Sequence, residues 1–274
     1  MSELKHHRLP SYHMHTRWSD GLATVESMVH QAAATGFEEI GISDHLAILP
    51  GAQPAPPWAI PPQRLAEYVE AVRNAARGAD IAVRVGVELE FFPETFDELL
   101  NLVAPHPFDF LIGSVHFDGN FPIDADPRHW EHLSQAEVDT VHRHYWQRVA
   151  DLARKGRVDF IGHLDLVKKF AFPAVANMDA VVAAALEAVA AAGLPVELNT
   201  AGWYKPCQDA YPSERLLREC CRRGIPVLIS DDAHETAHIG RDFQRATEVL
   251  RRIGYRETLA FAKRQRRVLS LGSP

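Results

Sequence analysis

A pair of histidines separated by one residue stands near the N-terminus, in the stretch SYHMHTRWSDG. His13 and His15 follow a short apolar lead-in and precede an acidic turn at Asp20 and Gly21. Residues two apart on a strand point to the same side, so both imidazoles can face one site. Imidazole is the commonest protein ligand for transition metals, although a lone strand-end histidine is more often structural. The pair raises the question of a metal site, and the rest of the chain must decide it.

Other ionisable residues end short apolar segments throughout the chain. Runs typical of buried strands cover residues 38–45, 81–92, 108–117, 157–166, 194–200 and 225–234, with SYHMH as a seventh. Parallel strands meet with their carboxyl ends at one face, where barrel sites are built. Such a gathering of ionisable groups would repel or stay unsatisfied unless cations held it together, so we expect a polynuclear metal site. The strand-end residues are Asp44, His45, Glu88, Glu90, His116, His163, Asp165, Asn199, Asp231, Asp232 and His234.

Helical patterns separate these strands, as in TVESMVHQAAATG, where Thr24 is a candidate N-cap and Gly36 a candidate stop. Alternation of strand and helix predicts an α/β fold with a parallel sheet, either open or closed into a barrel. Neither GxGxxG nor GxxxxGK[ST] follows the first strand, which disfavours nucleotide-binding open sheets. A chain of 274 residues suits one barrel, so we expect a single domain over 1–274. The Pro-rich stretch 48–62 is expected to be a loop over one barrel mouth and is a candidate lid.

Composition narrows the partners. The net charge of −7 argues against a nucleic-acid partner. Three cysteines without a CxxC pattern, and an N-terminus without an apolar leader, fit a reducing cytoplasm. The longest apolar stretch, 178–196, is interrupted by Asp179 and Glu187, so no membrane association is expected.

Six motifs in order, HMHTRWSDG, ISDH, GVELEFF, GSVHF, GHLDL and SDDAH, resemble those of the PHP (polymerase and histidinol phosphatase) superfamily. They span residues 13 to 234. Within that superfamily, GHLDLVKKF and ELNTAGWYKP are similar to the histidinol-phosphatase branch, which dephosphorylates L-histidinol phosphate in histidine biosynthesis. The resemblance implies a distorted (β/α)7 barrel, three divalent metal ions (Zn, Fe or Mn) and a small phosphorylated substrate.

The resemblance also implies ligand roles. Glu88, Asp232 and His234 are expected to be the catalytic members of the set. Asp232 is preferred to Asp231 because the family pattern Asp-x-His places it in phase with His234, which leaves Asp231 facing outward. Glu90 is expected beside the ligands or at the rim. The expected ligands are His13, His15, Glu88 and Asp232 for one ion, Glu88 as a bridge with His116 and His163 for the second, and Asp20, His45 and His234 for the third.

Substrate contacts are expected from lysines. Where some histidinol phosphatases carry arginines after GHxDL and NTAG, this chain has Lys168, Lys169 and Lys205. Lysine supplies charge to a phosphate without the bidentate fork of arginine. Lys168 and Lys205 are expected to bind the phosphate, with Asn199 and Arg17 as further substrate-binding residues. Asp44 and Asp165 are expected to orient ligand imidazoles.

The implied chemistry is phosphate ester hydrolysis by a hydroxide that bridges two metal ions, without a serine or cysteine nucleophile. The proton for the leaving alcohol could come from the third ion, Asp165 or a metal-bound water. Three alternatives remain open at this stage: a PHP-type 3′-5′ exonuclease, a phosphatase for another small phosphomonoester, and a non-catalytic barrel used for metal storage or regulation.

Overall fold

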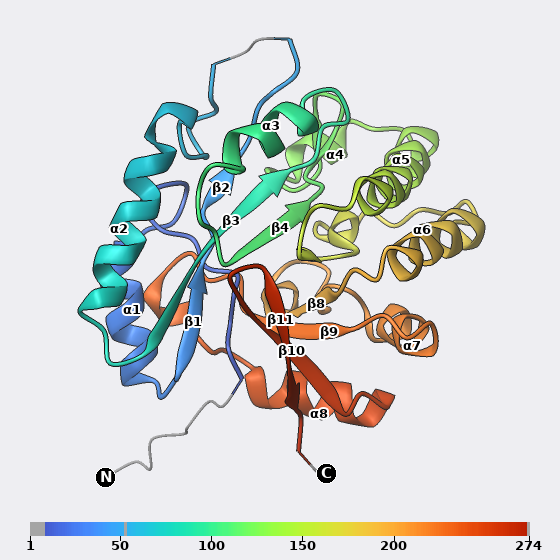
Figure 1. Cartoon of the computed structure of the whole chain (residues 1–274). Coiled ribbons are helices and arrows are strands. Elements are labelled where there is room, and N and C mark those ends of the chain that lie inside the picture. The colour runs from blue at the N-terminus through green and yellow to red at the C-terminus, as the bar shows by residue number, and fades with distance from the viewer. Residues whose placement is uncertain (1–8, 52–53, 273–274) are drawn as a thin grey trace.

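The computed structural model describes residues 9–51 and 54–272, which alternate strands and helices around a curled sheet (Figure 1). Positions 1–8, and 52–53 of the Pro-rich segment, lie outside the described residues. The strands are β1 (Glu39–Ile42), β2 (His45–Leu46), β3 (Ala82–Glu90), β4 (Phe110–Ser114), β5 (Phe117–Asp118), β6 (Phe121–Pro122), β7 (Phe160–Ile161), β8 (Val196–Asn199), β9 (Val227–Ser230), β10 (Glu257–Ala262) and β11 (Gln265–Ser270). The α-helices are α1 (Val25–Ala34), α2 (Leu65–Arg77), α3 (Phe96–Val103), α4 (Arg128–Glu131), α5 (Gln135–Lys155), α6 (Asp179–Ala191), α7 (Glu214–Arg222) and α8 (Phe243–Ile253), with 3-10 turns at Pro62–Arg64, Leu166–Lys168, Thr200–Tyr204 and Thr236–His238.

The main sheet is parallel, in the order β1-β3-β4-β7-β8-β9. β2 continues β1 in the same register on β3, since Ile42 pairs with Val85 and His45 with Glu88. The two outer strands are joined through the N-terminal segment, which makes parallel bridges from Ser11 to β1 and from Met14 to Ala233. Counting residues 11–15 as the first strand and β1 with β2 as one strand, these pairings give seven strands around a closed ring. This arrangement confirms the distorted (β/α)7 barrel. Residues 11–15 form only isolated bridges rather than the regular strand that their sequence predicts.

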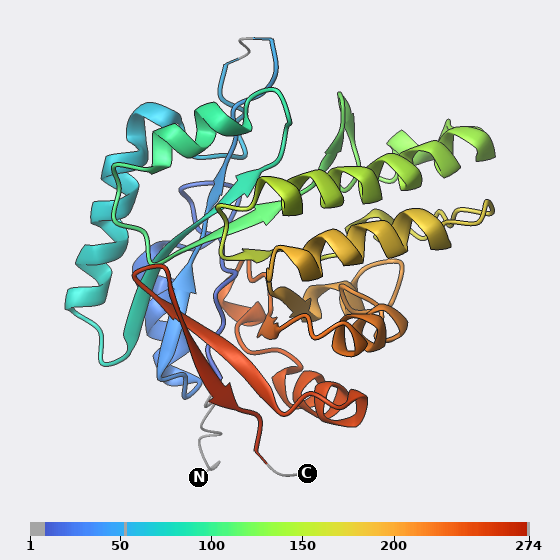
Figure 2. The ribbon, with the colours of Figure 1, turned by 45° about the vertical axis from the view of Figure 1, so that its right-hand side comes forward.

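The helices cover the outside of the barrel (Figure 2). Their ends follow local capping chemistry: the Thr24 side chain accepts a hydrogen bond from the Ser27 amide at the start of α1, as predicted. Ser134 and Glu137 form a reciprocal capping box that starts α5. Strands β4, β8 and β9 are buried along their whole length. Their sequences are largely apolar because parallel barrel strands are covered on both sides. No helix in the described part of the chain is both long and apolar enough to cross a bilayer.

An antiparallel hairpin of β10 and β11 follows the last helix and packs across the amino ends of the barrel strands (Figure 1). Its Phe261 joins a buried aromatic cluster with Tyr12, Phe110 and Phe160. The Tyr12 hydroxyl accepts a hydrogen bond from the Phe261 amide at 3.0 Å, so the first and last parts of the described chain are tied together here. The basic stretch 264–271 consists largely of β11.

Candidate metal centre

All nine residues expected as metal ligands lie together at the carboxyl ends of the barrel strands. Each comes from a barrel strand or from the loop that follows it. The parallel arrangement brings these carboxyl ends to one face of the barrel. The structure therefore brings together His13, His15, Asp20, His45, Glu88, His116, His163, Asp232 and His234.

Glu88 lies at the centre of the group and is fully buried. Its Oε2 atom lies 2.8 Å from His45 Nδ1 and 3.2 Å from His13 Nε2. Its Oε1 atom lies 2.9 Å from His163 Nε2 and 3.5 Å from His116 Nε2. The two oxygens of one carboxylate thus face two different sets of imidazoles, which is the arrangement that a bridging ligand requires.

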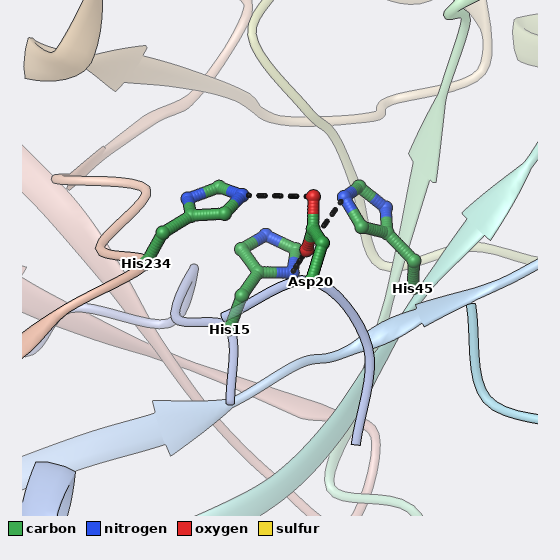
Figure 3. Close-up of side chains that lie close together, drawn as sticks. All are labelled: His15, Asp20, His45 and His234. Atoms are coloured by element: carbon green, nitrogen blue, oxygen red, sulfur yellow. Dashed lines mark ion pairs between the residues drawn. The ribbon is translucent and has the colours of Figure 1, made fainter. Parts of the chain in front are cut away.

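Asp20 lies at the outer edge of the cluster, between three imidazoles (Figure 3). Its Oδ2 atom is 3.4 Å from His234 Nε2, and its Oδ1 atom is 3.7 Å from His45 Nε2. His15 Nδ1 lies 3.9 Å from the same Oδ1 atom. One ligand atom from each of these four residues falls within 4.8 Å of the others, so together they can hold one ion.

Asp232 and Asp231 point in different directions. Asp232 Oδ1 lies 3.2 Å from His15 Nε2 and 3.7 Å from His13 Nε2. Asp231 instead accepts hydrogen bonds from Ser11 Oγ at 2.8 Å and from the Gly240 amide at 2.6 Å, inside the barrel wall. The phase argument from His234 therefore selects the aspartate that faces the cluster.

The donor set fits divalent metal ions. Within the described residues, His13 Nε2, His15 Nε2 and Glu88 Oε2 are buried and lack hydrogen-bond partners, although such atoms in proteins are normally paired. Three further groups of histidine and carboxylate atoms, beside the Asp20 group, lie within 4.8 Å of one another. Imidazole and carboxylate are the ligands preferred by Zn, Fe and Mn.

Electrostatics inside the cluster favour the ligand forms of two central residues. Burial and the neighbouring imidazoles of His45 and His234 lower the pKa of His15 to about 3, which leaves its ring neutral. Burial alone would raise the pKa of Glu88, but the surrounding imidazoles of His45, His13 and His116 outweigh it and lower that pKa well below its ordinary value. A neutral imidazole and an ionised carboxylate are the forms that bind metals.

Glu197, which the sequence reading missed, supports the cluster from behind. It is fully buried, and its carboxylate lies 3.0 Å from His13 Nδ1 while also accepting the His163 amide hydrogen bond. A carboxylate on Nδ1 turns Nε2 toward the cluster and fixes the tautomer. The signal in the sequence was its position two residues before Asn199, on the same face of the same strand. Glu90 does for His116 what Glu197 does for His13, since Glu90 Oε2 lies 2.6 Å from His116 Nδ1.

A cavity of about 360 Å³ opens directly over the cluster. Lys169, Lys205 and Arg241 supply positive charge to its wall, and Trp58 and Phe117 supply an aromatic part in which their rings stack at 5.9 Å. Asp124 also lines it, with its carboxylate 3.0 Å from Lys169 Nζ. Trp58 belongs to the Pro-rich segment 48–62, so the described part of that segment does contribute to the cavity mouth.

Three of the four residues expected to bind substrate are placed elsewhere. Lys168 turns away from the cavity, with Nζ 2.9 Å from Asp165 and 2.8 Å from Asp209. Arg17 is exposed and donates its Nε hydrogen bond to the Leu22 carbonyl. Asn199 is buried and donates to Glu197 at 3.0 Å, so its amide holds neighbouring site residues. Lys205 alone of the four lines the cavity.

The two aspartates expected to orient imidazoles have other contacts. Asp44 accepts hydrogen bonds from the Thr16 amide at 2.7 Å and from Ser19 Oγ at 2.6 Å, so it holds the loop that carries Asp20. Asp165 pairs with Lys168 and accepts the Ser213 amide hydrogen bond. Both residues brace backbone around the site.

The fold and this cluster define a class, the α/β barrels that carry histidines and carboxylates at the carboxyl ends of their strands. The model of the PHP domain family matches residues 11–201. The chain belongs to the PHP family.

Curated relatives and a solved structure extend this result. The chain is 34% identical over 258 residues to the probable histidinol-phosphatase of Deinococcus radiodurans, covering 92% of this chain and 96% of that protein. It is 25% identical to the histidinol-phosphatase of Bacillus subtilis, covering 82% and 92% of the two chains. The crystal structure of histidinol phosphate phosphatase from Lactococcus lactis, complexed with Zn, L-histidinol and phosphate, superposes with a TM-score of 0.78 at 20% identity, covering 95% of this chain and 99% of that one. This likeness shows a shared fold.

Proposed function

We propose that this protein is a histidinol-phosphatase, a metal-dependent phosphomonoesterase that hydrolyses L-histidinol phosphate to L-histidinol and phosphate in histidine biosynthesis. The observation that carries the proposal is the 34% identity to a probable histidinol-phosphatase over 92% of the chain. The histidine and carboxylate cluster below a small cavity supplies the corresponding chemistry. We place the enzyme in the cytoplasm, where its three free cysteines would stay reduced.

We propose three divalent ions, of Zn, Fe or Mn, held by the nine clustered residues. The assignment is supported by the two faces of Glu88, by the Asp20 group, and by the orphaned nitrogens of His13 and His15. Such ions supply Lewis acidity: they lower the pKa of water and offset negative charge on phosphoryl oxygens. In this assignment Glu88, Asp232 and His234 are the catalytic members, and Glu88 belongs to two ion sites.

The remaining cavity residues are proposed to bind the substrate. Lys205 and Lys169 lie on the cavity wall, where their ammonium groups can pair with phosphate oxygens left outside the ion cluster. Arg241, which the sequence reading did not single out, adds a third cation. The Trp58 and Phe117 rings offer a flat apolar surface for an imidazole, and the Asp124 carboxylate can accept from an amino group.

Asp165 loses its candidacy as the proton donor to the leaving alcohol. Its carboxylate is engaged by Lys168 and the Ser213 amide, and it is not among the residues that line the cavity. Of the three donors considered from the sequence, we therefore no longer propose Asp165.

A kinetic comparison of substrates tests the function. We expect kcat/KM for L-histidinol phosphate to exceed that for p-nitrophenyl phosphate or glycerol phosphate by at least about a hundredfold, because a site that pairs the amino and imidazole groups is left unsatisfied by esters lacking them. Equal rates on all three would reduce the protein to a general phosphomonoesterase.

Single-stranded DNA is the second arm of this test. A 3′-5′ exonuclease would need a groove for a polymer, whereas the cavity holds about 360 Å³ and the chain carries a net charge of −7. We therefore expect negligible nucleotide release, and efficient release would favour the exonuclease instead.

A further inference from the structure

A second cavity, of about 710 Å³, lies at the end of the barrel opposite the metal centre. It lies between α3, the loop before β4 and the turn of the β10–β11 hairpin. In both ribbon views the tip of this hairpin lies beside the start of β4 (Figures 1 and 2), and the Arg264 amide donates a hydrogen bond to the Asp109 carbonyl at 2.8 Å. The cavity is therefore assembled from segments far apart in the chain.

The rim of this cavity is basic although the protein as a whole is acidic. Arg73, Arg157, Lys263 and Arg264 line it, and Asp109 is the one carboxylate among its lining residues. The Asp109 carboxylate is already committed to backbone, because it accepts from the Val85 amide at 3.0 Å and the Lys263 amide at 2.9 Å.

The cations differ in how far they are already neutralised. Arg264 pairs with Asp159. Over residues 9–51 and 54–272, in contrast, the Arg157 guanidinium and the Lys263 ammonium have no ion-pair partner. Several positive charges around a concave surface raise the local concentration of anions.

The backbone conformation at these cations is a second observation about the cavity. Arg157, Lys263 and Arg264 have φ values of 66°, 50° and 63°, in the left-handed region that glycine, asparagine and aspartate adopt most easily. Lys263 and Arg264 form the two-residue turn between β10 and β11, where Asn-Gly or Asp-Gly is the favoured pair. A local rule broken at three charged positions around one cavity indicates a requirement for their side chains.

Below the rim the cavity is apolar. The exposed Ala104 and Pro107 contribute apolar surface to its lining, together with the edges of the buried residues Leu100, Val103, Phe108 and Leu111. The volume lies in the range of small-molecule sites. An apolar floor under several cations suits a ligand with both an apolar body and more than one negative charge.

We propose that this cavity binds a small organic anion that carries at least two negative charges on an apolar body. The site is separate from the metal centre, and the proposal does not rest on the proposed phosphatase activity. Both phosphoryl-type and carboxylate-type ligands share the required chemistry, so the test includes a probe for each.

Calorimetric titration of the metal-loaded protein tests the proposal. Naphthalene-1,5-disulfonate carries two tetrahedral oxyanion groups and stands in for the phosphoryl-type source, and benzene-1,3-dicarboxylate represents the carboxylate source. We expect at least one probe to bind with one-to-one stoichiometry, and the stronger one identifies the source. Failure of both probes to bind the wild-type protein would overturn the proposal.

The variants Arg157→Gly and Lys263→Gly remove a cation and at the same time relieve the left-handed backbone. We expect the double variant to bind at least about tenfold more weakly while its Tm is unchanged or higher. Lys263→Asn, which suits the same backbone, provides a second variant should the double glycine variant be unstable. Arg266→Ala, on the same hairpin but outside the cavity lining, should bind within about twofold of the wild-type protein.

A last variant separates the two cavities. Lys205→Met alters the cavity over the metal centre, and we expect it to leave probe binding unchanged. Loss of probe binding in Lys205→Met, or full binding in the double glycine variant, would place the anion elsewhere and overturn the proposal.

Discussion

The Nδ1 atom of His13 lies 3.0 Å from the carboxylate of Glu197, so His13 presents its other ring nitrogen to the proposed metal centre. We expect Glu197→Gln to weaken metal retention by about 10- to 100-fold, the usual effect of losing a carboxylate behind a ligand histidine. Elemental analysis after dialysis against graded chelator measures this change. Glu187→Gln, an exposed position on α6, is the control, and equal retention in the two variants would contradict the role given to Glu197.

Removing a central ligand should abolish the site rather than weaken it. Glu88→Ala and His163→Ala are expected to lose bound metal and to reduce kcat/KM by more than about a hundredfold, beyond the range of a supporting residue. Elemental analysis and circular dichroism on the same samples separate metal loss from unfolding. His30→Ala, an exposed histidine on α1, should behave as wild type. Full activity of the wild-type protein after exhaustive metal removal would refute a metal-dependent mechanism.

Substitutions of the three lysines near the cavity should have two different effects, one on catalysis and one on stability. Lys205→Met and Lys169→Met should lower kcat/KM by about 10- to 100-fold, the scale of a charge-assisted hydrogen bond of about 1.5–3 kcal/mol. Lys168→Met should leave KM nearly unchanged and destabilise the fold, because Asp165 then lacks its cation. Steady-state kinetics and thermal unfolding of the three variants test this division, and a raised KM in Lys168→Met alone would return Lys168 to the substrate site.

Lys205 should also set an alkaline limit to activity. Burial, with help from the nearby charge of Lys169, lowers the pKa of Lys205 below its ordinary value of 10.5. The ammonium form binds phosphate and exists below the pKa, so kcat/KM should fall as the pH rises through that lowered value. Lys205→Arg keeps its charge at higher pH and should move the alkaline limb upward. A pH–rate profile in which both proteins share one limb would assign it to another group.

Close packing against Phe110 leaves no room for a side chain at Gly86 in β3. A Cβ atom there would lie 2.1 Å from Phe110 Cζ in the buried aromatic cluster. We expect Gly86→Ala to lower the free energy of unfolding by about 1–3 kcal/mol through overpacking. Gly78→Ala, where the nearest atom would be 3.9 Å away, should be neutral or slightly stabilising. Denaturant unfolding measures the free energy of unfolding of both variants. Equal values would show that the aromatic cluster rearranges to make room for the added methyl group.

The alternation of strand and helix predicted a parallel α/β fold with its strand ends at one face, and the resemblance to the PHP family implied the seven-stranded barrel and the set of ligands. Strand-end histidines and carboxylates must converge in any parallel barrel, so their positions along the chain already imply proximity. The contacts of Lys168 and Asp165 were out of reach, because they depend on the direction of side chains in the turn after β7, where Asp165 adopts a φ of 79°. Arg241 joins the cavity only through the path of the loop after β9, and no strand periodicity reports such a path.

Because residues 11–15 close the barrel, the proposed metal ligands come together only when the first and last strands of the barrel have met. Ser11 and Asp231 are 220 positions apart and meet in the wall beside the cluster. His13 and His15 enter the barrel with the first strand, whereas Asp232 and His234 arrive after the last, so a nascent chain holds only part of the ligand set until both ends meet. Before that meeting, the edges of β1 and β9 are unpaired and open to other chains. In the proposed assignment, the complete set of ligands is therefore available to metal ions only after the barrel has closed.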